Sequence, residues 1–277
     1  MEATPVRKTM AVEAIPRVAA LMPAYNPGEI INRAVESLAN STYPCDIYIV
    51  DDGSDVPVAE SLGDFPRTKV IRLDKNRGVA HALNAGLKAI LMQPYDFVVR
   101  LDTDDFCYPE RIAKQVEFLD RHPEIAAVGA WARFLDESSG RTLFIVRTPD
   151  TPELVRKALH FTNVVLHPTS MIRTDALKNV GVYSERYPVA EDYELFRRIS
   201  QTFSVANIPS VLTDMRRSTQ GVSLTRRRRQ TFDRFRIQLK YFQALELDAW
   251  KGLFKTLLLF VFPVSFIAKI KEYRDSA

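Results

Sequence analysis

Strand-length apolar segments alternate with helical patterns through the first hundred residues of the chain. Each segment ends in turn-forming or acidic residues, as parallel strands do when they leave a βαβ unit. The sequence predicts strands at 18–22, 47–50, 69–73 and 98–101, and helices at 30–38 and 79–92. Strands of this kind between helices indicate an α/β fold, a doubly wound sheet with helices on both faces.

The second half of the chain predicts further elements. The helical spacing of its apolar residues predicts a helix at 109–121. Apolar segments at 125–135 and 142–146 flank a turn-like stretch and predict a hairpin that makes the sheet mixed. Another amphipathic helix begins at Glu191.

Polar residues follow each of the four predicted strands. Ligands of doubly wound sheets bind outside the carboxyl ends of the strands. We therefore expect Tyr25, Asp52, Arg77 and the acids at 102–105 to share one rim, although the sequence separates them widely. The alternatives are an ordinary turn aromatic at Tyr25 and a simple strand-ending turn at 52–54.

The turn after the first strand narrows the choice of ligand. It contains one glycine, whereas a dinucleotide fold carries Gly-x-Gly-x-x-Gly there, and a phosphate-binding loop of the Walker type is absent from the sequence. A nucleoside diphosphate suits the rim, with aromatic and carboxylate contacts to base and ribose and a cation bridging the phosphates.

Three carboxylates crowd the end of the fourth predicted strand, at Asp102, Asp104 and Asp105. Such side chains repel one another unless a cation lies among them. Mg²⁺ or Mn²⁺ is the natural candidate, because these ions use one or two carboxylates together with substrate phosphates. The alternative is a helix N-terminus, with Asp104 or Asp105 capping a helix that begins near Pro109.

Composition is that of a globular chain. Its 277 residues, 46% hydrophobic and 26% charged, suffice for one large α/β domain or two small ones. The net charge is +4, and the basic surplus is concentrated at 226–229, which suggests an anionic surface or ligand. Cys45 and Cys107 form neither a disulfide framework nor a metal motif, and residues 1–16 contain no apolar leader, so a cytoplasmic location is expected.

Five motifs occur in the order and approximate spacing found in family 2 glycosyltransferases. They are Pro23-x-Tyr25-Asn26, Asp51-Asp52-Gly53-Ser54, Asn76-Arg77-Gly78 with Asn84-Ala85-Gly86, Arg100-x-Asp102-x-Asp104-Asp105, and Glu191-Asp192-Tyr193. The chain resembles this family over residues 16–225. The resemblance implies a GT-A fold and transfer of a sugar from a nucleotide-sugar donor with inversion at the anomeric carbon.

The resemblance also implies roles at the donor site. It assigns nucleotide-sugar contacts to Pro23, Tyr25, Asn26, Asp52, Arg77 and Asp102. Asp52 is expected to accept a hydrogen bond from the base, which suits uridine or deoxythymidine diphosphate. Asp102 and Asp104 match the Asp-x-Asp pair that serves the ribose and the Mn²⁺ or Mg²⁺ ion.

Asp192 matches the catalytic base of the family. A carboxylate within hydrogen-bond reach can take the proton of the attacking hydroxyl. The alternative is that Glu191 and Asp192 only favour a helix N-terminus. The segment that contains His167 resembles the family's segment beneath the acceptor pocket. His167 has either a structural role there or a role as a metal ligand.

The segment 215–223 is polar, basic and expected to be flexible. In the family the corresponding stretch closes over the donor, and Arg216 or Arg217 is expected to add charge-assisted hydrogen bonds to the diphosphate. The Gln-x-x-Arg-Trp signature of processive polysaccharide synthases is absent. This departure favours a non-processive hexosyl- or deoxyhexosyltransferase that adds one sugar.

The last fifty residues differ in character. A basic helix is predicted at 226–245, and the uncharged run 256–268 is shorter than the ~20 residues of a membrane-spanning helix. Flanking lysines suggest a segment lying in the interface of an anionic leaflet, with packing on the core as the alternative. The expected organisation is a loose N-terminal arm (1–16), a GT-A domain (17–225) and membrane-associating helices (226–277), with membrane contact through 226–271 on the inner face of the cell membrane.

The function expected from these features is transfer of one sugar to a glycan or lipid-linked acceptor of a bacterial-type surface polysaccharide, lipopolysaccharide or exopolysaccharide. A sugar-phosphate nucleotidyltransferase is one alternative, but it requires a glycine-rich basic loop after the first strand. An inactive membrane-bound scaffold is another. Nucleic acid is not an expected partner, because the arginine block lacks aromatic stacking platforms.

Overall fold

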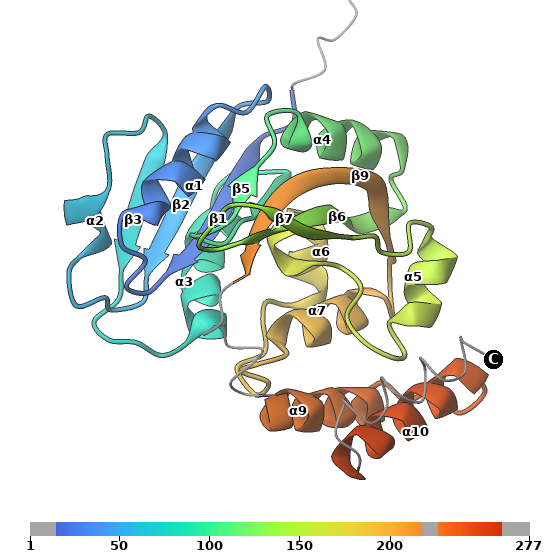
Figure 1. Ribbon diagram of the computed structural model, residues 1–277. Helices are drawn as coiled ribbons and strands as arrows, with labels where there is room; N and C mark the ends of the chain where they lie inside the picture. The colour runs from blue at the N-terminus through green and yellow to red at the C-terminus, as the bar shows by residue number, and fades with distance from the viewer. Residues whose placement is uncertain (1–14, 218–226, 262–277) are drawn as a thin grey trace, which may run out of the picture.

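A mixed sheet runs through the protein (Figure 1). The computed structural model describes residues 15–217 and 227–261, and within them the sheet has nine strands. The strands are β1 (Val18–Ala24), β2 (Cys45–Asp51), β3 (Thr68–Arg72), β4 (Phe97–Arg100), β5 (Phe106–Cys107), β6 (Ile125–Asp136), β7 (Thr142–Val146), β8 (Met171–Arg173) and β9 (Ser204–Arg217). Their order is β3-β2-β1-β4-β8-β6-β9-β5, and β7 pairs with β6.

Helices cover both faces of this sheet. They are α1 (Ile30–Ala39), α2 (Val58–Ser61), α3 (Val79–Leu91), α4 (Arg111–Arg121), α5 (Pro152–Ala158), α6 (Thr174–Val180), α7 (Glu191–Ile199), α9 (Arg227–Lys240) and α10 (Leu247–Val261), with a 3-10 turn, η1, at His167–Thr169. The apolar faces of α1 and α4 pack on one side, and those of α3, α6 and α7 pack on the other. In β1, Ala20 and Met22 enter the first core while Ala19 and Leu21 enter the second, which explains its unbroken apolar run.

The predicted first half of the fold is confirmed. β3, β2, β1 and β4 are parallel neighbours, and the predicted helices α1 and α3 join β1 to β2 and β3 to β4. The short α2 between β2 and β3 was not predicted. Because parallel neighbours end at the same edge, the loops that follow β1, β2 and β4 lie together. This is the rim expected to bind a ligand.

The second half turns the parallel sheet into a mixed one, as predicted. β8 is antiparallel to both β4 and β6, and the hairpin β6–β7 is stabilised by stacking of Phe134 on Phe144 at 5.0 Å between ring centroids. The long β9 runs parallel to β6 and continues to Arg217. The expectation of a flexible segment from residue 215 is therefore wrong for 215–217, because strand pairing with β6 orders them; residues 218–223 lie outside the described ranges.

The helix-cap alternative for the acid cluster is also wrong. The two-residue strand β5 follows Asp105 directly and pairs with β9. α4 begins only at Arg111, and no side chain caps its N-terminus. The acids therefore belong to a tight connection between two strands, and helices α5 and α6, which the sequence did not predict, complete the second half.

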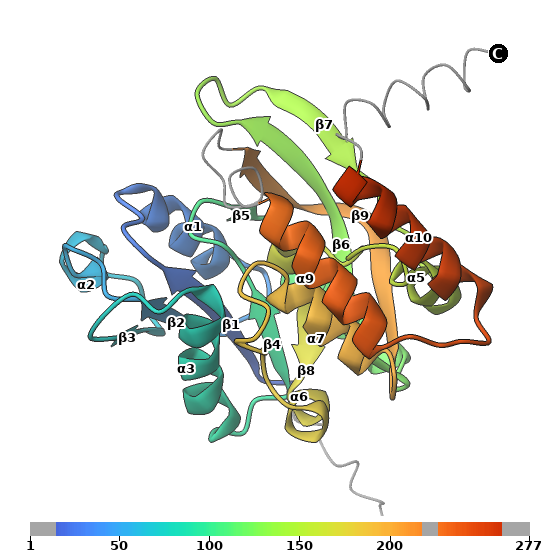
Figure 2. The same ribbon diagram turned by 90° about the horizontal axis from the view of Figure 1, so that it is seen from below.

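The helices α9 and α10 pack together against the domain below α7 (Figures 1 and 2). Lys240 and Tyr241 both contact Glu194 of α7, with Nζ and the hydroxyl at 2.8 and 2.5 Å from its Oε1. Gly252 of α10 lies so close to the carbonyl of His160 that a Cβ at this position would clash with it. One face of the pair thus packs on the core, as the alternative interpretation of the C-terminal segment predicted.

The opposite face of α10 is exposed to solvent. Trp250, Phe254 and Leu257 are 54%, 63% and 43% exposed, and Lys251 and Lys255 lie beside them. In the part of the chain that the structure describes, none of the helices has the length and apolar character needed to cross a bilayer. The loose arm predicted at 1–16 falls almost wholly outside the described residues, as does the end of the apolar run at 262–268.

Candidate active site

The loops after β1 and β2 are joined by Asn26. Its backbone N–H donates to Ser54 Oγ at 2.9 Å, and its amide exchanges two 2.9 Å hydrogen bonds with Asp55. Asn26 also adopts a positive φ of 47°, which asparagine tolerates better than most residues. Asn26 therefore braces the rim, and Tyr25, directly before it, is left half-exposed at the end of β1.

Asp52 is buried and connects β2 to the loop before α3. Its two carboxylate oxygens accept hydrogen bonds from the backbone N–H groups of Arg77 and Gly78, at 3.0 and 2.8 Å. Each oxygen keeps a second lone pair that can accept from a ligand. Gly53 permits this close approach, because a Cβ there would lie 2.6 Å from the backbone of Lys75 and its φ is +71°.

The side chain of Arg77 is half-exposed on the same rim. Its Nη2 lies 3.9 Å from Glu185, which also contacts the ring nitrogen of His81 at 3.1 Å. Pro23 is half-buried within β1, two residues before Tyr25. The sequence-predicted donor residues after β1, β2 and β3 thus lie along one continuous edge.

The acid cluster lies at the end of β4. Burial, together with the charge of Asp102, raises the pKa of Asp104 to about 6. Asp105 is buried, accepts the backbone N–H of Arg216 at 3.0 Å, and has a pKa raised well above its usual value, first by burial and then by the two other aspartates. Asp105 therefore fixes β9 to the cluster, a role that the sequence did not predict.

Asp102 and Asp104 suit a divalent cation. Their crowding raises the pKa of Asp104, and a cation between them would relieve the repulsion. Carboxylate oxygens are the ligands that Mg²⁺ and Mn²⁺ prefer. No group of three or more His, Cys, Asp or Glu side chains suited to a metal occurs within residues 15–217 and 227–261, so two carboxylates would need substrate phosphates to complete the coordination.

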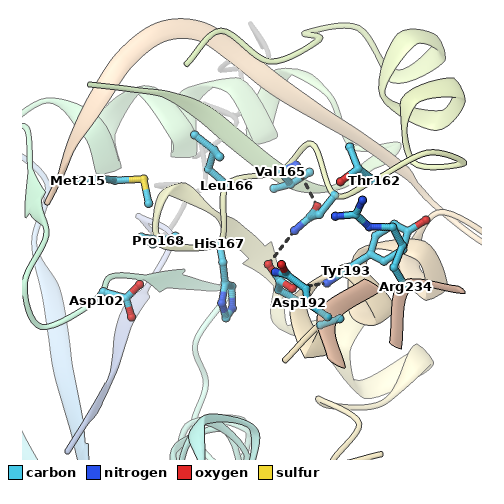
Figure 3. Close-up of a pocket in the computed structure, with 13 residues that line it drawn as sticks. Asp102, Thr162, Val165, Leu166, His167, Pro168, Asp192, Tyr193, Met215 and Arg234 are labelled. Carbon is cyan, nitrogen blue, oxygen red and sulfur yellow. Dashed lines mark hydrogen bonds between the residues drawn. The ribbon is translucent and has the colours of Figure 1, made fainter. Parts of the chain in front are cut away.

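A pocket of about 360 Å³ joins the acid cluster to α7 (Figure 3). Asp102 and Asp192 both line it, although 90 residues separate them in the sequence. Asp192 Oδ2 accepts a 2.8 Å hydrogen bond from Asn163, and Oδ1 accepts the backbone N–H of Tyr193 at 2.6 Å. These bonds orient the carboxylate, while burial raises its pKa.

The neighbouring acid differs from Asp192 in its surroundings. Glu191 is buried and does not line the pocket, and burial together with the charge of Asp192 raises its pKa to about 8. Burial and the neighbouring charge of Asp192 therefore favour the protonated form of Glu191. Of the two acids at the start of α7, Asp192 is the one that faces the pocket.

His167 also lines the pocket and lies between Asp102 and Asp192 (Figure 3). Its Nε2 is 2.7 Å from the hydroxyl of Tyr183, and burial, with a smaller effect of Arg100, lowers its pKa well below the usual value. A neutral imidazole bonded to a tyrosine fits the structural interpretation of this residue better than metal coordination.

Arg100 is buried, and its charge acts both on the acid cluster at the end of β4 and on Glu191 and Asp192 at the start of α7. It donates from Nη2 to Asp102 at 2.6 Å, and its Nε and Nη1 are buried with no hydrogen-bond partner in the described structure. The sequence contained Arg100 within a motif but gave it no role. Its position at the end of a buried strand, next to three aspartates, was the available signal.

Arg216 and Arg217 lie against the β6–β7 hairpin. Arg216 Nη2 donates to the carbonyl of Glu137 at 2.8 Å, and the guanidinium of Arg217 lies 5.7 Å from the ring of Phe144. Arg216 is still near enough to Asp104 to lower the pKa of that carboxyl. Of the two arginines proposed for the diphosphate, Arg216 is thus the one near the acid cluster.

Two residues of α9, Gln230 and Arg234, complete the pocket lining. The sequence predicted a basic helix here, and neither contact with the pocket was expected from it. Gln230 and Arg234 lie one helical turn apart just after the arginine run, but only the docking of α9 on α7 brings Arg234 to Tyr193 and Thr162 (Figure 3).

Comparisons with known proteins identify the family of the chain. The profile of glycosyl transferase family 2 matches residues 19–181. The amylovoran biosynthesis glycosyltransferase AmsE of Erwinia amylovora is 33% identical over 207 residues, which are 72% of this chain and 74% of that protein. The Escherichia coli UDP-Gal:alpha-D-GlcNAc-diphosphoundecaprenol beta-1,3-galactosyltransferase is 25% identical over 213 residues, 74% of this chain and 76% of that protein.

Solved structures show the same fold. The crystal structure of S. aureus TarS 1–349 in complex with UDP aligns with a TM-score of 0.65 and 20% sequence identity. The alignment covers 90% of this chain and 73% of TarS 1–349. The GT-A fold expected from the sequence is confirmed.

Proposed function

Because the chain belongs to glycosyltransferase family 2, we propose that it transfers a single sugar, with inversion, from a nucleotide-diphosphate sugar to a glycan or lipid-linked acceptor. The observation that carries the proposal is the pocket shared by Asp102 and Asp192. It joins the strand ends, where a donor binds in this fold, to an oriented carboxylate that can receive a proton.

The donor would bind along the rim. Tyr25 offers an exposed ring at the end of β1, suited to stacking on a base, and Asp52 has free lone pairs for the base N–H. Asn26 and Pro23 would stabilise the conformation of this edge, and Arg77 can donate hydrogen bonds to oxygens of the donor. TarS 1–349 binds UDP, which supports a pyrimidine diphosphate donor, UDP- or dTDP-linked, without deciding between them.

The donor diphosphate would be held at the acid cluster. Asp102 and Asp104 would hold Mn²⁺ or Mg²⁺, which supplies Lewis-acid stabilisation of the negative charge on the departing diphosphate. Arg216, near Asp104, can add a charge-assisted hydrogen bond to the same phosphates.

Asp192 would act as the base. The acceptor hydroxyl oxygen forms a bond to the anomeric carbon while the bond from that carbon to the diphosphate oxygen breaks, and the hydroxyl proton passes to Asp192. Asn163 and the N–H of Tyr193 hold the carboxylate toward the pocket. Asp192 lines the pocket whereas Glu191 does not, and burial favours the protonated form of Glu191, so Asp192 is the acceptor of that proton in this proposal.

The biological context is proposed from the relatives. AmsE belongs to amylovoran biosynthesis, and the E. coli galactosyltransferase acts on a diphosphoundecaprenol-linked sugar, so we place this chain in bacterial-type surface polysaccharide biosynthesis. The exposed apolar face of α10 and its lysines support peripheral contact with the inner face of the cell membrane. Membership in a glycosyltransferase family argues against the nucleotidyltransferase alternative.

A panel of nucleotide sugars tests the proposal and the inactive-scaffold alternative together. The protein is incubated with each donor and Mn²⁺, and released nucleoside diphosphate is measured. We expect release from at least one UDP- or dTDP-sugar, lost on addition of a chelator and restored by Mn²⁺. No nucleotide release from any donor, with or without a mixture of lipid-linked acceptors, would contradict an active transferase.

A further inference from the structure

The pocket extends past the proposed base onto α9. In Figure 3, Asp102 lies at one side of the pocket and Arg234 at the other, with Asp192 between them. Asp102 marks the donor side, since it belongs to the acid cluster. Arg234 therefore lies on the side from which an acceptor approaches Asp192.

Arg234 is held at this place by the packing of α9. One turn further along, Ile237 is fully buried, and Gln238 donates from Nε2 to the carbonyl of His160 at 2.9 Å. The charge of Arg234 is close enough to Tyr193 to lower the pKa of that hydroxyl, which burial raises to about 12. A guanidinium is thus a fixed part of the pocket wall next to Asp192.

A fixed cation on the acceptor side favours an anionic acceptor group. The donor phosphates belong at Asp102 and Asp104, on the other side of Asp192, so they do not explain a guanidinium here. Guanidinium groups match phosphate oxygens in a planar, bidentate way. Gln230, one turn before Arg234 and also in the pocket, adds an amide donor.

The surroundings of Arg234 suggest what lies beyond the phosphate. Arg228 and Arg229 are exposed earlier on α9, and the neighbouring α10 exposes the apolar side chains of Trp250 and Phe254. A lipid-linked sugar carries a hydroxyl, a phosphate and a hydrocarbon chain, and Asp192, Arg234 and the exposed apolar side chains of α10, which packs on α9, offer a partner for each of these groups.

We propose that Arg234 and Gln230 form a subsite for the phosphate of an acceptor in which the sugar is joined to a lipid through a phosphate or diphosphate. The proposal rests on the proposed transferase function and names the acceptor class of that site. It predicts an acceptor whose attacked sugar lies next to the phosphate, rather than the end of a long neutral glycan.

Binding of farnesyl diphosphate to the protein saturated with UDP and Mn²⁺ tests the subsite, because the donor phosphate site is then filled. We expect Arg234→Gln to weaken this binding at least tenfold and Arg234→Lys to weaken it less. Arg236→Gln, on the same helix but outside the pocket lining, is the matched control and should bind within about twofold of the wild type. Farnesol should bind more weakly than farnesyl diphosphate and should not respond to Arg234→Gln.

Two further measurements show whether the diphosphate or the hydrocarbon chain is bound, and whether the probe occupies the donor site. Inorganic pyrophosphate should bind in an Arg234-dependent manner but more weakly than farnesyl diphosphate, since it lacks the hydrocarbon chain. Equal binding of farnesyl diphosphate to the wild type and to Arg234→Gln would overturn the subsite, as would release of UDP on its addition, because the probe would then occupy the donor site. Failure to bind UDP at all, by contrast, would count against the proposed function itself.

Discussion

Arg100 Nη2 donates a 2.6 Å hydrogen bond to Asp102 from a side chain that is only 4% exposed. The same guanidinium lowers the pKa of Asp104, Glu191 and Asp192, each of which burial raises. One buried cation therefore acts on the proposed metal site and on the proposed base at once. Without it, acids from two distant parts of the sequence would lose the one cation that acts on both Asp104 and Asp192 in these contacts.

Replacing this cation should disturb both halves of the site. In Arg100→Met, which keeps a long side chain without the charge, the pKa of Asp104 should rise further. Mn²⁺ binding should then require a higher pH than in the wild type, and sugar transfer at pH 7 should fall ~10-fold or more because Asp102 loses its anchor. The measurement is Mn²⁺ affinity against pH, and an unchanged profile would show that Arg100 has only a structural role.

Asp192→Asn should separate chemistry from donor binding. The variant keeps the shape of the side chain but cannot accept the hydroxyl proton, so kcat should drop ~10²–10⁴-fold. The dissociation constant of UDP should change little, since Asp192 lies away from the rim. Glu191→Gln is the matched control at the neighbouring position, because Glu191 does not line the pocket and burial favours its neutral form, and it should retain most of the activity.

Much of this site was predictable because local rules determine it. The loop acids and Tyr25 follow apolar strands, and parallel strands deliver their ends to one edge whatever the details of packing. The motif at Glu191 was found through its resemblance to a family, and the pocket then joined it to Asp102. What the sequence missed depends on long-range packing: Asp105 bonded to the backbone of Arg216, and Arg234 brought to the pocket by α9.

The hydrogen-bond partners of the rim residues could not be predicted from the local sequence either. Asn26 was expected to contact the donor, yet its amide is committed to Asp55, and Asp52 is shared with the backbone of Arg77 and Gly78. The sequence indicates where polar groups gather. It does not indicate which of them satisfy one another, because that depends on loop geometry.

Metal binding should depend on pH through Asp104. The carboxyl must lose its proton to bind the ion, and its pKa is raised to about 6 by burial and by Asp102. Affinity for Mn²⁺ in the presence of UDP should therefore fall as the pH is lowered through about 6. Isothermal titration between pH 5 and pH 8 checks this, and Asp104→Asn should bind Mn²⁺ weakly across the whole range.

Tyr25→Ala should weaken nucleotide binding without affecting the fold. Half of the side chain is exposed, so its removal creates no cavity in the core. Stacking of a base on an aromatic ring contributes about 1–3 kcal/mol, so the dissociation constant of UDP should rise ~5- to 150-fold. Tyr25→Phe keeps the ring and should bind almost as the wild type does; equal affinity of the alanine variant would contradict a stacking role.

The exposed face of α10 should determine attachment to lipid. Burying an apolar side chain of this size contributes about 1.5–3 kcal/mol when complete, so partial insertion of two of them makes a tenfold effect a modest expectation. Trp250→Ser with Phe254→Ser should therefore reduce binding to vesicles that contain phosphatidylglycerol by ~10-fold or more. The melting temperature should fall only modestly, because Phe254 faces solvent and Trp250 contributes one ring contact with Phe242 and one hydrogen bond to the carbonyl of Ala244.

The matched control replaces two apolar residues outside α10 that are at least as exposed, Val56→Ser with Met92→Ser, and it should bind vesicles as the wild type does. Because Lys251 and Lys255 contribute through charge, wild-type binding should also weaken as salt is raised from 0.05 to ~0.5 M, where the Debye length is only a few ångströms. Equal loss in both double variants would mean that general surface hydrophobicity, and not α10, holds the protein at the membrane. If the α10 double variant bound vesicles as well as the wild type, the apolar face of α10 would be assigned to contact with a protein partner and not with lipid.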